Sequence, residues 1–172
     1  MRLGNIRPIY PRMHLTQLGD KKYIYPYLLR NLKVARVNQV WAIDITYVPM
    51  QKGFMYLMAV MDLYSRYIVG WDLSNTLDAE ASLQVLKVAV TEHGKPEIIN
   101  SDQGSQFTCK EYVDYFKDAS ICISMDGKGR VLDNIFIQIF WRTIKYQHIY
   151  LNPAKDGITL YQGISRWIDK YN

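Results

Sequence analysis

Two aspartates and one helical polar stripe are the features of this 172-residue chain whose residue types and positions could do chemistry. Asp44 stands between Ile43 and Ile45 in the apolar segment VWAIDITYVPM. A carboxylate there is costly unless it faces a solvated site, a partner or a metal. The competing interpretation puts Asp44 on the polar side of an edge strand, and the residue taken alone favours that interpretation.

The second aspartate, Asp102, ends a short predicted strand at 97–102 and is followed by Gln103 and Gly104. Ligand sites collect at the carboxyl ends of strands in sheets covered by helices. A glycine in the following loop lets the backbone approach a ligand closely. An aspartate before a glycine loop also forms turns, so a turn former is the competing interpretation.

The polar stripe belongs to a helix predicted at 132–147. Residues three, four and seven positions apart share one face of a helix. Four polar residues follow this rule: Asn134, Gln138, Arg142 and Lys145. A solvated face of an amphipathic helix explains them, and so does a surface where polar amides and two cations follow a phosphate backbone.

The hydrophobic pattern predicts the elements that position these residues. Strands are predicted at 40–50, 54–65, 67–74, 97–102 and 121–125, and short turns join the first three as an antiparallel meander. Helices are predicted at 78–94, 110–120 and 132–147, with a weaker pattern for one more at 158–172. This order predicts an α/β fold, a mixed five-stranded sheet with helices packed on it.

Basic residues are concentrated at the start of the chain. Residues 1–40 hold eight Lys or Arg and one acidic residue, whereas the rest of the chain holds 13 basic and 15 acidic residues. The asymmetry fits a polyanionic partner, most simply nucleic acid, and fits a solvated linker equally well. Scattered Pro and Gly with no sustained period make residues 1–39 a predicted arm or linker.

Several classes of protein are disfavoured by composition. The apolar run 54–64 is broken by Asp62, well short of the roughly 20 residues that a membrane span needs. The first residues have no apolar stretch typical of a secretory signal. Cys109 and Cys122 have no metal-ligand spacing and are predicted to be reduced thiols.

Five strings, in matching order and spacing, resemble the integrase core of bacterial insertion-sequence transposases. They are WAIDITYVPM, YLMAVMDLYSRYIVGWDLS, SDQGSQFT, ISMDGKGR and DNIFIQIFWRTIKY. That family belongs with retroviral integrases in the ribonuclease-H-like superfamily. The likeness makes residues 40–151 the predicted catalytic core, 1–39 a basic N-terminal arm and 152–172 a C-terminal helical segment, truncated relative to the family.

The resemblance implies DNA integration and transposition through metal-dependent phosphodiester hydrolysis and strand transfer, with three catalytic carboxylates. Asp44 and Asp102 match the first two and would hold two divalent ions, Mg²⁺ with Mn²⁺ as the alternative. The third, a Glu on a helix, is expected after 35 intervening residues, a spacing that falls on Gln138. The amide is therefore expected to leave the second ion weakly held and catalysis impaired.

The resemblance also implies partners. DNA, as transposon ends and target, is the expected ligand, a homo-oligomer is the family's working form, and no membrane is involved. The residues expected to contact DNA are Gln103, Lys128, Arg130, Asn134, Arg142 and Lys145. The chain lacks the family's helix-turn-helix region and its basic C-terminal stretch, so loose DNA binding is expected. A cytoplasmic bacterial protein, associated with the nucleoid when bound to DNA, is the expected setting.

Other functional interpretations stay open. The chain could remain an enzyme that uses the Gln138 carbonyl, with manganese. It could be a non-catalytic DNA-binding or interaction fragment of a decayed transposase. A ribonuclease-H-like nuclease without transposition fits the predicted fold but not the strings. Departures at Ile139 and Gln147 favour genomic decay of position 138 over a deliberate change.

Overall fold

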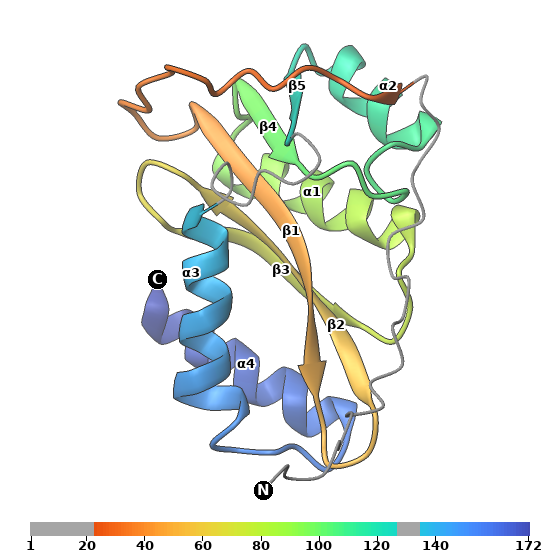
Figure 1. The fold of residues 1–172 in the computed structure, drawn as a ribbon, viewed down its shortest axis with the longest axis vertical. Helices are drawn as coiled ribbons and strands as arrows, with labels where there is room; N and C mark the ends of the chain where they lie inside the picture. The colour runs from red at the N-terminus through yellow and green to blue at the C-terminus, as the bar shows by residue number, and fades with distance from the viewer. Residues whose placement is uncertain (1–22, 127–134) are drawn as a thin grey trace, which may run out of the picture.

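A five-stranded sheet with helices packed against it forms the protein, and the computed structural model describes residues 23–126 and 135–172 (Figure 1). The strands are β1 (Val40–Pro49), β2 (Phe54–Asp62), β3 (Ile68–Ser74), β4 (Ile98–Ser101) and β5 (Cys122–Met125). The helices are α1 (Ala79–His93), α2 (Lys110–Asp118), α3 (Ile135–Ile144), the π-helical turn η3 (Lys145–Ile149) and α4 (Gly157–Tyr171). The predicted α/β fold with a mixed sheet is confirmed.

The strand order is β3-β2-β1-β4-β5. β1 pairs with β2 and β2 pairs with β3 in the antiparallel sense, as the meander prediction required. β4 is parallel to β1, and β5 is parallel to β4. β1 is therefore the central strand, and the interpretation that placed Asp44 on an edge strand is wrong.

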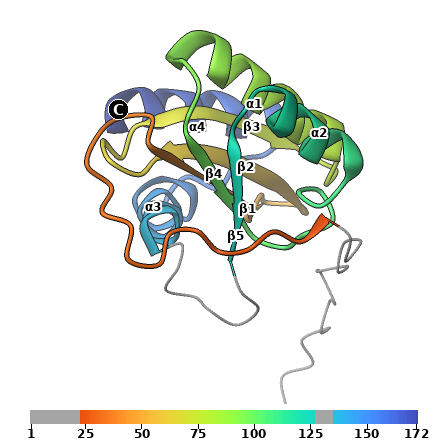
Figure 2. The same cartoon turned by 90° about the horizontal axis from the view of Figure 1, so that it is seen from above.

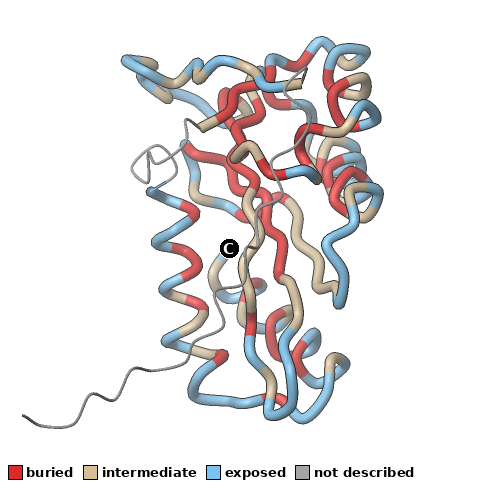
Figure 3. The backbone as a smooth tube through the Cα atoms, turned by 45° about the vertical axis from the view of Figure 1, so that its right-hand side comes forward, coloured by how far each residue is buried: buried red, intermediate tan, exposed pale blue. Residues whose placement is uncertain are grey.

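Each face of the sheet has its own hydrophobic core. Side chains alternate between the faces along a strand, so Ala42 of β1 packs with residues of α3 and α4. Its neighbour Ile43 packs with residues of α1 and α2. Figure 2 shows α1 and α2 on the side of the sheet opposite α3. Figure 3 shows that the buried positions run along the central strands.

Local signals account for where the helices begin. The Asp78 carboxylate accepts a hydrogen bond from the Glu80 N–H at the start of α1, and Asp156 accepts one from the Thr159 N–H at the start of α4. Such caps satisfy backbone donors that have no partner inside the helix. α4 confirms the weakly patterned helix expected at 158–172. The helix expected at 132–147 has its first three residues outside the described ranges and ends in η3.

The described part of the predicted arm, residues 23–39, runs beside β5 at one end of the sheet (Figure 1). The Leu28 N–H donates to the Ser124 hydroxyl at 3.0 Å, and the Tyr25 N–H points at the Met125 sulfur at 3.4 Å. These contacts attach the segment to the strand that ends beside Asp126. In the described ranges, no helix is both long enough and apolar enough to cross a membrane.

Candidate active site

Asp44 and Asp102 lie on neighbouring parallel strands. The register pairs Ala42 of β1 with Asn100 of β4, the last pair of that ladder. Asp44 lies two residues beyond this pair on β1, Asp102 directly follows β4, and the charge of Asp102 acts on Asp44. Because side chains two residues apart on a strand share a face, both carboxylates belong on the face covered by α3. The two aspartates expected from the resemblance are therefore brought together by β1 and β4.

A third carboxylate stands in the same row. β4 and β5 pair Asn100 with Ser124 and Ser101 with Met125. Asp126 follows Met125 directly, and its N–H donates to the Ser101 carbonyl at 2.9 Å. The side chain of Asp126 accepts a hydrogen bond from the Asn100 amide at 2.8 Å. Sequence reasoning missed Asp126, because only the pairing of β4 with β5 reveals its position.

The Asp44 carboxylate is partly buried and held by two donors. Its Oδ1 accepts the Ile45 N–H at 2.8 Å, and its Oδ2 accepts the Trp141 indole N–H at 3.0 Å. Burial raises the pKa of Asp44 to about 6, although the two hydrogen bonds oppose this rise. The negative charges of Asp102 and Asp126 add to it. Such a site favours the arrival of positive charge.

The loop after β4 holds Asp102 in place. Asp102 Oδ1 accepts the Gly104 N–H at 2.8 Å, so Asp102 does form a turn, as the competing interpretation expected. Burial raises the pKa of Asp102, and the bond from Gly104 opposes the rise. The Gln103 side chain donates to the Asp126 carbonyl at 3.0 Å, which ties the loop to the end of β5.

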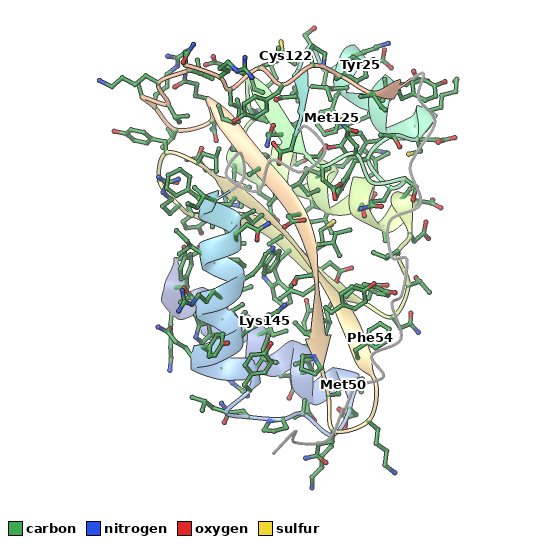
Figure 4. All side chains as sticks on the ribbon, viewed as in Figure 1. Tyr25, Met50, Phe54, Cys122, Met125 and Lys145 are labelled. Carbon is green, nitrogen blue, oxygen red and sulfur yellow. The ribbon has the colours of Figure 1, made fainter. Side chains whose placement is uncertain are left out.

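α3 contacts this row through Trp141, whose indole N–H donates to Asp44. Gln138 and Arg142 are exposed, whereas Trp141 is buried against the sheet. Lys145, at the start of η3, points toward β1 and donates to the Thr46 hydroxyl at 2.7 Å (Figure 4). Burial lowers the pKa of Lys145, and the nearby charge of Asp44 opposes this change.

Three of the residues expected to bind DNA, Lys128, Arg130 and Asn134, lie outside the described ranges. Arg142 is free to meet a ligand at the surface, while Lys145 and Gln103 already have protein partners. DNA contact by any member of this set stays a prediction.

The donor set can be compared with what a divalent ion requires. Mg²⁺ is usually held by one or two carboxylates together with substrate phosphates. Asp44 and Asp102 supply two partly buried carboxylates whose pKa values are raised, and this chemistry fits such an ion. Within residues 23–126 and 135–172, no three His, Cys, Asp or Glu side chains form a ready ligand group. Substrate oxygens would have to complete the coordination.

The order and directions of the strands define a ribonuclease-H-like fold, and solved structures agree with it. The HTLV-2 integrase catalytic core domain in complex with magnesium matches with a TM-score of 0.54 and 21% identity, over 63% of this chain and 68% of that chain. A simian T-cell lymphotropic virus intasome structure matches with a TM-score of 0.63 and 16% identity, over 79% of this chain and 49% of that chain.

The family follows from sequence comparison. The model of the integrase core domain matches residues 34–131, and the chain belongs to this family. A transposase for insertion sequence element IS904 of Lactococcus lactis is 30% identical over 186 residues, covering 98% of this chain and 74% of the relative. Transposase InsF for an Escherichia coli insertion sequence is 33% identical over 115 residues, 66% of this chain and 40% of the relative. The predicted resemblance to insertion-sequence transposases is confirmed.

Proposed function

We propose that the chain carries the catalytic core of an insertion-sequence transposase and that Gln138 impairs its metal-dependent DNA cleavage and strand transfer. The observation that carries this proposal is the meeting of Asp44 and Asp102 in one row of the sheet, beside the helix that bears position 138. Similarity to transposases supports the DNA chemistry. The spacing between Asp102 and Gln138 in the sequence supports the role of position 138.

Asp44 and Asp102 are the residues that would hold divalent ions, Mg²⁺ or Mn²⁺. When bound, such ions would activate the attacking oxygen and stabilise the leaving oxygen of an in-line displacement at phosphorus. The protein contributes two anionic side chains of fixed orientation, since each accepts a backbone N–H. No covalent bond between enzyme and DNA is needed, because water and then a DNA 3′-hydroxyl act as nucleophiles.

Gln138 would stand where the third carboxylate belongs. An amide has one oxygen that can coordinate a cation, has no net charge and turns its NH₂ group away from a metal. Gln138 is exposed on α3, so its side chain is free to reach a bound ion. The second ion is therefore weakly held, and cleavage is slower by several orders of magnitude than with Glu.

DNA would approach along the exposed side of α3. Arg142 is the described cation next to Gln138 on that face, and it supplies charge for a backbone phosphate. We further propose that the core works as a homo-oligomer on paired DNA ends. Action on DNA would place it in the bacterial cytoplasm, at the nucleoid when bound.

A non-catalytic DNA-binding fragment is the second candidate, and the amide at position 138 favours it. The two candidates differ in one assay. Nicking and strand transfer on end-labelled DNA are measured with Mg²⁺ and with Mn²⁺, for the chain and for Gln138→Glu. The transposase proposal predicts weak activity in the chain, higher with Mn²⁺, and a large gain in Gln138→Glu.

Controls keep that assay decisive. Asp44→Asn placed in the Gln138→Glu background should abolish the gain, because the first carboxylate is then lost. Equal activity of the chain and Gln138→Glu would contradict the assignment of position 138. DNA binding without any cleavage in Gln138→Glu, by a folded protein, would favour the binding fragment.

A further inference from the structure

Two hydrogen bonds join α3 and η3 to β1 beside the site. The Trp141 indole donates to Asp44 Oδ2 at 3.0 Å, and the Lys145 ammonium donates to Thr46 Oγ1 at 2.7 Å. Asp44 and Thr46 are alternate residues on one face of β1, and Trp141 and Lys145 are one turn apart. The two hydrogen bonds therefore join one face of the helix to one face of the strand.

The two hydrogen bonds are separated by similar distances along the helix and along the strand. One helical turn advances about 5.4 Å, and two strand residues advance about 6.6–6.8 Å. A helix lying along the strand can thus form both hydrogen bonds without bending. This match sets the position of the helix along the strand, and position 138 lies nearly one turn before Trp141.

We propose that Trp141 is a positioning residue whose indole N–H orients the Asp44 carboxylate for metal binding and aligns α3 with β1. This inference rests on the proposed function. Trp141 is buried, and its ring packs against Phe140 in the core that α3 shares with the sheet. The ring is held rigidly by the core, so its N–H points in a fixed direction.

The hydrogen bonds leave Asp44 able to bind ions. Each carboxylate oxygen offers two lone pairs. Oδ1 uses one for the Ile45 N–H, and Oδ2 uses one for Trp141. One lone pair remains on each oxygen, so the carboxylate would still be able to bind a cation. Rotation of the carboxylate would break both hydrogen bonds, so the orientation is preset before any ion arrives.

Replacing Trp141 by Phe tests the role, because it keeps the aromatic packing and removes the N–H. Partners that orient a metal ligand typically change metal affinity by about 10–100-fold. Mn²⁺ binding to the chain is measured by the loss of the free-ion electron paramagnetic resonance signal. We expect Trp141→Phe to weaken Mn²⁺ binding by about 10-fold or more. Trp167→Phe is the matched control, since Trp167 packs on α4 in the same core and should leave affinity unchanged.

The Asp44→Asn variant separates the two claims. If Mn²⁺ affinity depends on Asp44 but is the same in Trp141→Phe as in the unaltered chain, the positioning role is wrong and the metal site stands. If Asp44→Asn leaves Mn²⁺ affinity unchanged, the metal site itself is wrong and the positioning role fails with it.

A second measurement does not depend on whether Trp141→Phe folds. The indole N–H signal of Trp141 in a ¹H–¹⁵N correlation spectrum of the unaltered chain reports its hydrogen bond directly. We expect this signal to move when Mg²⁺ is added and when Asp44 is replaced by Asn, while the Trp167 signal stays in place. A Trp141 signal that responds to neither change would overturn the inference.

Discussion

Asp44 and Asp102 lie close together at the end of the parallel β1–β4 pair, where burial, and after it the negative charge of Asp102, raises the pKa of Asp44. Burial is the larger cause of the rise, and Asp126 on the next strand adds to it. Negative charge is thus concentrated where the resemblance to transposases expects cations. The folded protein bears an electrostatic cost that bound Mg²⁺ or Mn²⁺ would relieve.

The first prediction concerns stability and pH. The pKa of Asp44 is raised from its ordinary 3.8 to about 6, so the folded state holds this proton to higher pH than the unfolded chain does. The contribution of Asp44 to the free energy of unfolding therefore falls as pH rises from about 4 to about 6 and stays low above it.

Asp44→Asn removes this penalty. Urea unfolding should show the variant more stable by about 1–3 kcal/mol at pH 8, with the gap closing toward pH 4; a gap independent of pH would contradict the prediction.

The second prediction concerns divalent ions. Carboxylates must be ionised to coordinate a metal, and an ion that binds only the folded state stabilises it. Mn²⁺ at about 100 times its dissociation constant should raise the free energy of unfolding by about 2.7 kcal/mol. Thermal unfolding should show a larger gain at pH 8 than at pH 5. The Asp102→Asn variant is expected to lose most of the stabilisation by Mn²⁺. If Mn²⁺ stabilises this variant as much as the unaltered chain, Asp102 is not a ligand.

The third prediction concerns the polar chain that supports Asp126. The Ser124 hydroxyl accepts the Leu28 N–H and donates to Asn100, whose amide donates to Asp126. Ser124 and Asn100 are fully buried, so Ser124→Ala leaves buried groups without partners. We expect a loss of about 1–3 kcal/mol in urea unfolding. The exposed Ser105 provides the control, since Ser105→Ala should change stability by less than about 0.5 kcal/mol.

The fourth prediction concerns DNA binding by α3. Each phosphate contact contributes about 0.9 to the slope of log affinity against log salt for duplex DNA. Arg142→Ala should weaken DNA binding and lower the magnitude of this slope by about 0.9, the value for one phosphate contact. Arg166→Ala makes the same change of charge on α4, where Arg166 is also exposed, and should have a smaller effect. Equal effects of both variants would show a response to net charge alone.

The sequence was sufficient to predict much of the fold because local patterns determine the elements. Alternating β-branched and aromatic residues marked the meander, and the period of 78–94 marked α1. The wrong interpretation of Asp44 has a physical reason. A strand buried on both faces and an edge strand can carry the same short pattern, and only pairing with β4, far along the chain, distinguishes them.

The contacts that complete the site could not be predicted, because they join residues distant in sequence. Trp141 reaches Asp44 across 97 positions, and nothing in the local helical pattern points to this contact. Asp126 lies in the string ISMDGKGR that carries the resemblance, yet its place beside Asp102 follows from the register of β4 and β5. Position 138 follows from the spacing that the resemblance to transposases implies, and its role stays a prediction.

Mn²⁺ affinity of the chain and of Gln138→Glu, measured side by side, tests the central claim most directly. Gln147→Glu serves as the control, since Gln147 is exposed on η3 and gains the same charge. If position 138 is the third ligand position of the metal site, Gln138→Glu binds Mn²⁺ at least about 10-fold more tightly than the unaltered chain. Gln147→Glu then binds Mn²⁺ with the same affinity as the unaltered chain. Unchanged affinity in Gln138→Glu, or an equal gain in both variants, would contradict the account.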